Sequence, residues 1–395
     1  MQRFALVFVG LLVCFGSAPA QQLAFLNRDI KDLRAWARED TNDAHRQYYL
    51  ALAHWKRREW KQADSLLRLA SALEPRYPEA YLALASLPYA RRGQLRDEET
   101  RDKVPEAWRP AVTEARQLYQ RAFRTDPMVS LEILGIDAPQ EPQALDYGLQ
   151  EYQIYLRYYA WAVDLAFGRY PSARQRLAKL AEREFDEVKH PDRVPDFIFW
   201  YRGLAAAHSY QYELAIADFR VLLDRTLKQQ QREEVIPVPL KDNEYRFMLA
   251  ALHHLAGHTD SAIALYQESL EHDLGLVMAH TYLASIYEEA GRGDDALLER
   301  RRAAEVSGED PAALFDLGVS LFNSGRMGEA INHLYRAIGL NPRYAPPYYV
   351  LGRIGEALKQ PEEAGDKYRQ FLARGPLRLT DLRADAQERL GKLLK

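Results

Sequence analysis

A period of 34 residues is the feature of the sequence that most constrains the fold. Ala262, Ala296 and Ala330 are spaced by 34 residues, and Ala364 continues the series. Around these alanines the same pattern of leucine, tyrosine, glycine and proline returns, most clearly over residues 311–344. Four consecutive units in register indicate an array of repeated structural units, each of which contacts mainly its neighbours.

Small residues recur at two fixed positions of this unit. Position 20 is alanine in all eight units that can be assigned, and position 8 is alanine or glycine in seven of them. This predicts two helices per unit that cross with their backbones close together. Position 15 is glycine in four units (Gly168, Gly257, Gly291 and Gly325), which allows a left-handed turn after the first helix. Proline at position 32, as at Pro342, stops the second helix.

This 34-residue pattern resembles the tetratricopeptide repeat (TPR) family, whose unit is a helix–turn–helix. The clearest unit carries Leu317, Gly318, Gly325, Ala330 and Pro342. The resemblance implies an all-α protein, a right-handed α-solenoid of about eight helix–turn–helix units. Terminal helices that cover the last apolar faces are expected at both ends of such an array.

The units are not equally regular along the chain. Trp161 stands where unit 3 should have a small residue, and Arg202 occupies a position of unit 4 that is usually buried. We expect a signal peptide over residues 1–20, an N-terminal helix over 21–43, units 1 and 2 over 44–127 with an insertion near 88–105, a connection over 128–153, degenerate units 3 and 4 and a connection over 154–242, units 5–8 over 243–378, and a C-terminal capping helix over 379–395.

The first twenty residues have the pattern of a secretory signal peptide. Arg3 precedes an apolar stretch over residues 4–15, and Ala18-Pro19-Ala20 places small residues at the cleavage site. Cleavage there would start the mature chain at Gln21 and remove Cys14, the only cysteine. We therefore expect an exported protein, periplasmic or secreted, without thiol chemistry and without membrane insertion after signal cleavage.

Charge and motifs argue against several classes of function. The chain has 53 basic and 56 acidic residues, whereas a nucleic-acid binder usually shows a basic excess. The phosphate loop, the nucleophile elbow and the zinc-binding His-Glu-x-x-His motif are missing from the sequence, so no cofactor, metal or catalytic residue is expected. Glu244, Glu288, Glu289 and Glu356 fall on groove positions, and an all-α hydrolase or lyase would need such carboxylates to converge.

Aromatic residues concentrate at position 5 of the units. In the TPR family this position of the first helix lines a concave groove, so the resemblance implies that its side chains face a bound protein or peptide. Packing against the neighbouring unit is the alternative interpretation. The residues are Tyr48, Tyr158, Trp200, Phe247, Phe315 and Tyr349.

These observations favour a non-catalytic scaffold that binds a protein or peptide outside the cytoplasm, through an aromatic-lined concave groove. Rigid aromatic side chains are frequent among the residues that dominate binding energy. The TPR clamp for peptide C-termini requires Lys and Asn at groove positions, which this chain lacks, so that activity is not carried over. The alternative is an assembly scaffold that docks by its convex face or its termini.

Overall fold

The computed structural model describes residues 28–92, 109–129, 160–162, 164–165, 167–231 and 242–393. These residues form helices joined by short turns, and no β-strand occurs among them. The predicted signal peptide and Tyr158 lie outside the described residues, as do parts of the predicted insertion and connections.

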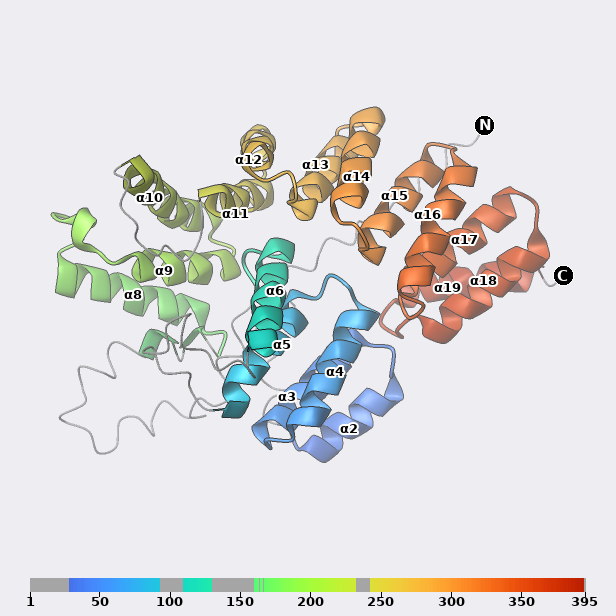
Figure 1. Cartoon of the computed structure of the whole chain (residues 1–395), viewed down its shortest axis with the longest axis horizontal. Helices are drawn as coiled ribbons and strands as arrows, with labels where there is room; N and C mark the ends of the chain where they lie inside the picture. Colours follow the sequence, from blue (N-terminus) through green and yellow to red (C-terminus); the bar gives the residue numbers. More distant parts are fainter. Residues whose placement is uncertain are drawn as a thin grey trace.

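Successive helices pack in antiparallel pairs that follow the units of the sequence (Figure 1). The pair α5 and α6 is longer than 34 residues, because the predicted insertion lies between its two helices. The first helix, α2, and the last helix, α19, pack on the helix pairs at either end of the array, which confirms the predicted all-α solenoid. The helices are α2 (Ile30–Glu39), α3 (Ala44–Lys56), α4 (Trp60–Leu73), α5 (Pro78–Arg92), α6 (Arg109–Thr125), α8 (Tyr170–Phe185), the short 3₁₀ helix η6 (Pro191–Arg193), α9 (Asp196–His208), α10 (Tyr212–Gln231), α11 (Asp242–Leu255), α12 (Thr259–His272), α13 (Val277–Glu289), α14 (Gly293–Val306), α15 (Pro311–Asn323), α16 (Met327–Leu340), α17 (Pro346–Ala357), α18 (Pro361–Arg374) and α19 (Thr380–Leu393).

The small residues of the repeat lie where the two helices of a unit cross. All eight alanines at position 20 are buried. A Cβ atom placed on Gly318 would lie 2.8 Å from Cγ of Leu334 and 3.5 Å from the carbonyl oxygen of Ala330. Glycine at position 8 therefore makes room mainly for the large side chain at position 24, and only secondarily for the alanine at position 20.

The turn inside each unit needs one residue in the left-handed region. The glycines predicted at position 15 have positive φ, for example 75° at Gly325. Arg58, Tyr210 and Lys359 occupy the same position in their units, with φ of 59°, 59° and 58°. The turn geometry is thus retained even where the residue is not glycine, although a side chain makes this conformation costlier.

Two residues that depart from the repeat pattern have local partners. Trp161 packs its ring against Tyr201, with centroids 4.7 Å apart. Arg202 donates to Asp218 and to Glu187, with Nη2 2.7 and 2.8 Å from their carboxylate oxygens. Burial acts to lower the pKa of Arg202, but these two carboxylates outweigh it and raise the pKa. The arginine is therefore tolerated as part of a charged cluster.

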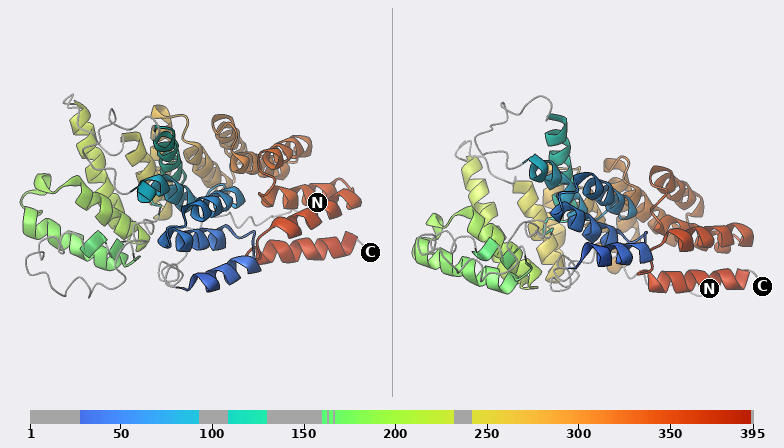
Figure 2. Two further views of the ribbon diagram at one scale, coloured as in Figure 1. Left: turned by 60° about the horizontal axis from the view of Figure 1, so that its bottom comes forward. Right: turned by 90° about the horizontal axis from the view of Figure 1, so that it is seen from below.

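The chain folds into two parts that differ in position. Helices α8–α19 form a long arc, and helices α2–α6 lie inside that arc (Figure 1). We call them the arc and the N-terminal block. Seen from below, the block covers the middle of the arc, and α2 comes close to α19 (Figure 2). The concave side of the arc is therefore occupied by the beginning of the same chain.

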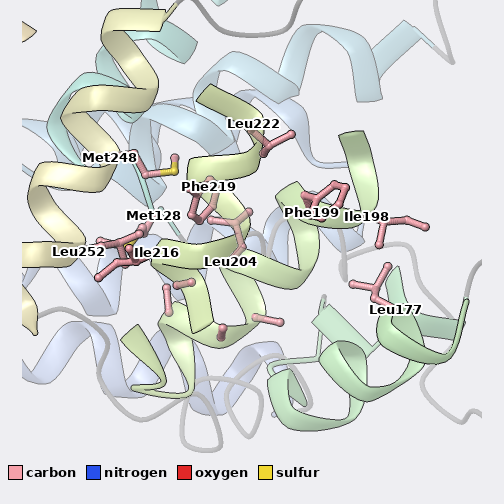
Figure 3. Close-up of a cluster of buried hydrophobic side chains, with 14 of the residues drawn as sticks. Met128, Leu177, Ile198, Phe199, Leu204, Ile216, Phe219, Leu222, Met248 and Leu252 are labelled. Atoms are coloured by element: carbon pink, nitrogen blue, oxygen red, sulfur yellow. The ribbon is translucent and has the colours of Figure 1, made fainter. Parts of the chain in front are cut away.

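The block has a hydrophobic core of its own. One cluster of buried residues runs from Leu33 to Val129 and draws only on the block. The arc has three further clusters, one of which is drawn in Figure 3. Met128, just after α6, joins this arc cluster and lies beside Ile216 and Leu252 (Figure 3). The buried apolar clusters of block and arc thus meet over only a small area.

Candidate binding surface

The aromatic residues predicted to line the groove contribute to packing within the solenoid. Since buried rings are not accessible to a partner in this arrangement, their burial favours the packing interpretation, and a role in binding stays a prediction. Tyr48, Phe247, Phe315 and Tyr349 are buried, Trp200 is partly buried, and Tyr158 lies outside the described residues.

Trp200 is a predicted groove residue that contacts both the arc and the N-terminal block. It lies on α9, where it packs edge-on against Phe219 of the same unit and against Tyr245 of the next, with centroids 5.5 and 6.1 Å away. On its other side is Phe123 of α6, 6.4 Å away. The tryptophan therefore joins two units of the arc and also contacts the block.

The other predicted residues contact their own or adjacent units. Tyr48 packs against Tyr77 at 5.2 Å, and Phe315 packs edge-on against Tyr344 at 5.6 Å. The hydroxyl of Tyr349 donates to Asp385 of α19 at 2.6 Å. This contact fixes the C-terminal helix to the last unit.

Two arginines of the block reach carboxylates of the arc. Nη1 of Arg76, in the loop between α4 and α5, lies 2.7 Å from Asp316 of α15. Arg124 of α6 donates to Asp273, which precedes α13, at 2.9 Å. Burial acts to lower the pKa of Arg76, but the nearby carboxylates of Asp316 and Asp310 outweigh it and raise the pKa. Arg76 is therefore held in its charged form at the contact.

A third ionic contact runs in the opposite direction, from the arc to the block. Arg378, between α18 and α19, donates to Glu74 at 2.5 Å and lies 3.7 Å from Asp43. Close by, the backbone N–H of Leu377 donates to Asp40 at 2.5 Å. These contacts join the first and last parts of the described chain.

Two amide side chains reinforce the same boundary. Asn42 donates to the carbonyl oxygen of Ala373 at 3.1 Å, and Asn341 donates to that of Ala72 at 2.5 Å. The boundary between block and arc is thus held mostly by polar and ionic contacts. The sequence pattern did not single out these residues, because they lie in the loops between units.

A pocket of about 410 Å³ opens between the block and the arc. Its walls come from α5, α6 and α11 and from the start of α13, and combine apolar side chains with a few charged ones. Concave sites with this mixture of side chains suit binding. Phe247 reaches the pocket from the arc, and Tyr119 and Phe123 reach it from α6.

Buried ionisable groups also lie at this boundary. Asp126, after α6, accepts a hydrogen bond from the backbone N–H of Met128 at 2.8 Å. Burial raises its pKa to about 6, against the opposing effect of this hydrogen bond. Burial lowers the pKa of His208, on α9, to about 4, so this imidazole is neutral at pH 7.

The carboxylates considered for catalysis have separate partners. Glu288 accepts from Arg300 of α14, and Glu356 accepts from Arg389 of α19. Glu244 lies in the first turn of α11, and Glu289 ends α13. Within the described ranges no group of three His, Cys, Asp or Glu side chains could hold a metal ion. Among the same residues, no helix has the length and apolar character needed to cross a membrane.

The fold defines the class of the protein, which is an α-solenoid built from helix–turn–helix units. Residues 281–345 match the tetratricopeptide repeat family. This part of the chain therefore consists of tetratricopeptide repeats, as the sequence pattern predicts. No curated protein matches it.

Several solved structures are similar to parts of the chain. A crystal structure of MamA has 25% sequence identity and a TM-score of 0.31, and covers 37% of this chain and 92% of its own. MamA from Desulfovibrio magneticus RS-1 has 13% identity and a TM-score of 0.38, covering 47% and 97%. The C-terminal part of a TPR repeat-containing protein from Cytophaga hutchinsonii has 17% identity and a TM-score of 0.43, covering 60% and 84%.

Proposed function

We propose that this protein is a non-catalytic scaffold that binds another protein or a peptide through the concave side of its arc. The observation that carries the proposal is that this side already holds a folded protein surface, the N-terminal block. Aromatic contact at Trp200 and ionic contact at Asp316 and Asp273 accompany that association. A surface able to hold one protein segment in this way has the chemistry to hold another.

The alternative is an assembly scaffold that docks by its convex face or its termini. Exposed apolar residues occur singly; Tyr335 of α16, for example, contacts Glu363 and Lys367 of α18, the second helix of the next unit. Scattered exposed side chains of this kind are normal on protein surfaces and do not by themselves mark an interface. The concave side is therefore the better candidate.

Site-specific photo-crosslinking distinguishes the two faces. A photoreactive phenylalanine derivative placed at Trp200 tests the concave side, and the same residue at Tyr335 is the matched control. Both positions are aromatic, so the replacement changes little volume. We expect covalent partner adducts in cells from position 200 and none from position 335. Adducts from position 335 alone would show that the partner binds the convex face.

We further propose that the protein acts outside the cytoplasm. The support is the apolar stretch of residues 4–15 followed by Ala18-Pro19-Ala20, a pattern that signal peptidases cleave. Intact-mass measurement of the exported protein should give a chain that starts at Gln21. A chain that keeps Met1 and stays with the membrane fraction would contradict export.

A further inference from the structure

The boundary between block and arc differs from the boundaries between successive units. Successive units pack helix against helix, whereas the block keeps its own core and contacts the arc mainly through loops and α6. Among the helix pairs that join block and arc, α6 and α13 pack the most. Apart from Met128, which joins an arc cluster, the buried side chains of the two parts would therefore stay in their own cores if the block moved away from the arc.

Some polar atoms at this boundary are poorly satisfied. Nε and Nη2 of Arg76 are buried without a hydrogen-bond partner among the described residues, and so is the hydroxyl of Tyr282 on α13. Burying an unsatisfied polar group opposes the closed arrangement. Release of the block would return the Arg76 nitrogens to water, and a different segment that satisfied the Tyr282 hydroxyl would compete with the block on favourable terms.

The contacts of the block also define what such a segment should carry. Arg76 approaches Asp316, with Asp310 nearby, and Arg124 approaches Asp273, so the arc presents carboxylates to incoming arginines. Next to Arg124, Phe123 contacts Trp200. The block therefore places an arginine beside an aromatic side chain on this surface.

We propose that the N-terminal block is a built-in competitor for the concave side of the arc. The partner that displaces it is a protein segment with arginine next to an aromatic residue. This inference rests on the proposed binding function and adds its regulation and the chemistry of the partner. Because the block is tethered, it competes at an effective concentration of the order of millimolar, so the closed form lowers the apparent affinity for a partner.

Opening the closed form requires changes on the block that leave the arc unaltered. Arg76→Glu places a carboxylate against Asp316, and Arg124→Glu does the same against Asp273. The Arg124 side chain is 47% exposed, so the single variant Arg124→Glu should fold and takes the place of the double variant if Arg76→Glu prevents folding. Arg68→Glu is the matched control, because Arg68 is 51% exposed and its carboxylate partners, Asp64 and Glu114, belong to the block itself.

Small-angle X-ray scattering and peptide binding then test the two halves of the proposal on the full chain. We expect the double variant Arg76→Glu/Arg124→Glu to have a larger radius of gyration than the wild type, with unchanged helicity by circular dichroism. The Arg68→Glu variant should stay compact. A labelled synthetic peptide of residues 119–129, which contains Phe123-Arg124, should bind the double variant at least about tenfold more tightly than the wild type.

A second peptide, identical except for Glu in place of Arg124, should lose this gain. A double variant as compact as the wild type would overturn the inference, and so would an expanded variant with unchanged peptide affinity. In either case partner adducts at position 200 would leave the proposed function standing. Adducts at position 335 alone, with no peptide binding by any variant, would reject the proposed function as well.

Discussion

At the scale of single residues, Asp126 is the ionisable group whose environment is most unusual. Its carboxylate is buried after α6 and accepts one backbone hydrogen bond, from Met128. Burial raises its pKa to about 6 from an ordinary value of 3.8. The folded protein therefore binds this proton more tightly than the unfolded chain does, and the side chain opposes folding above pH 6.

Replacement by a neutral acceptor should remove that cost. Asp126→Asn keeps an oxygen for the Met128 N–H, and we expect a higher unfolding midpoint than the wild type at pH 7.5. The gain is at most about 3 kcal/mol and should shrink as the pH falls from about 6 to about 4, because the folded aspartate is protonated there and the unfolded one is close to its ordinary pKa. Thermal unfolding of the variant and the wild type at pH 7.5 and at about pH 4 measures this gain, with Asp64→Asn as a control at a more exposed carboxylate. An equal gain at both values would contradict it.

At the scale of helices, a small residue at position 8 makes room for a large side chain at position 24 of the same unit. Gly352 faces Tyr368 and Gly203 faces Phe219 in the same way as Gly318 faces Leu334. A methyl group on any of these glycines would lie less than 3 Å from the partner side chain. The two helices of a unit therefore depend on each other for their close crossing.

The pair Gly318→Ala and Gly339→Ala measures this dependence. The first adds a methyl group 2.8 Å from Leu334, whereas the second adds one on α16 with nothing within 4 Å. We expect Gly318→Ala to destabilise the protein by about 1–3 kcal/mol, and Gly339→Ala to stabilise it by about 0.5–1 kcal/mol. Hydrogen exchange should rise mainly in unit 7 and its neighbours. A uniform rise over the whole arc would be inconsistent with local coupling.

The sequence predicts these helices well because each unit repeats the same local signals. The buried alanines at position 20 and the left-handed glycines at position 15 were visible as a pattern with a 34-residue period. The left-handed Arg58, Tyr210 and Lys359 were not, because the turn is imposed on them by the two helices that they join rather than by their own preference. Propensity alone cannot reveal a conformation that packing enforces.

At the scale of the molecule, the closure of block on arc could not be read from the sequence. The triplet Pro-Arg-Tyr occurs twice, at Pro75-Arg76-Tyr77 and at Pro342-Arg343-Tyr344. Arg76 is largely buried against Asp316, whereas Arg343 is exposed. The same local signal thus has two outcomes, because the partner of Arg76 lies 240 residues away in the sequence and follows no period.

Salt should affect this closure more than it affects the helices. The pairs Arg124–Asp273 and Arg378–Glu74 are partly exposed, and mobile ions screen such pairs beyond about 10 Å at 0.1 M and about 3 Å at 1 M. We expect the radius of gyration of the wild type to increase between about 50 mM and 1 M sodium chloride, with constant circular dichroism. A radius that does not change would mean that apolar contacts alone keep the block in place.

The hydrogen bond from Leu377 to Asp40 has a mechanical consequence. A solenoid of stacked pairs stretches like a coil spring, because small rotations add up from one unit to the next. In this molecule the two ends of the coil are joined to each other, so a pull on them acts first on a few hydrogen bonds and ion pairs between loops. The coil itself extends only after those contacts break, which would give the protein a stiff response to weak force and a compliant one to strong force.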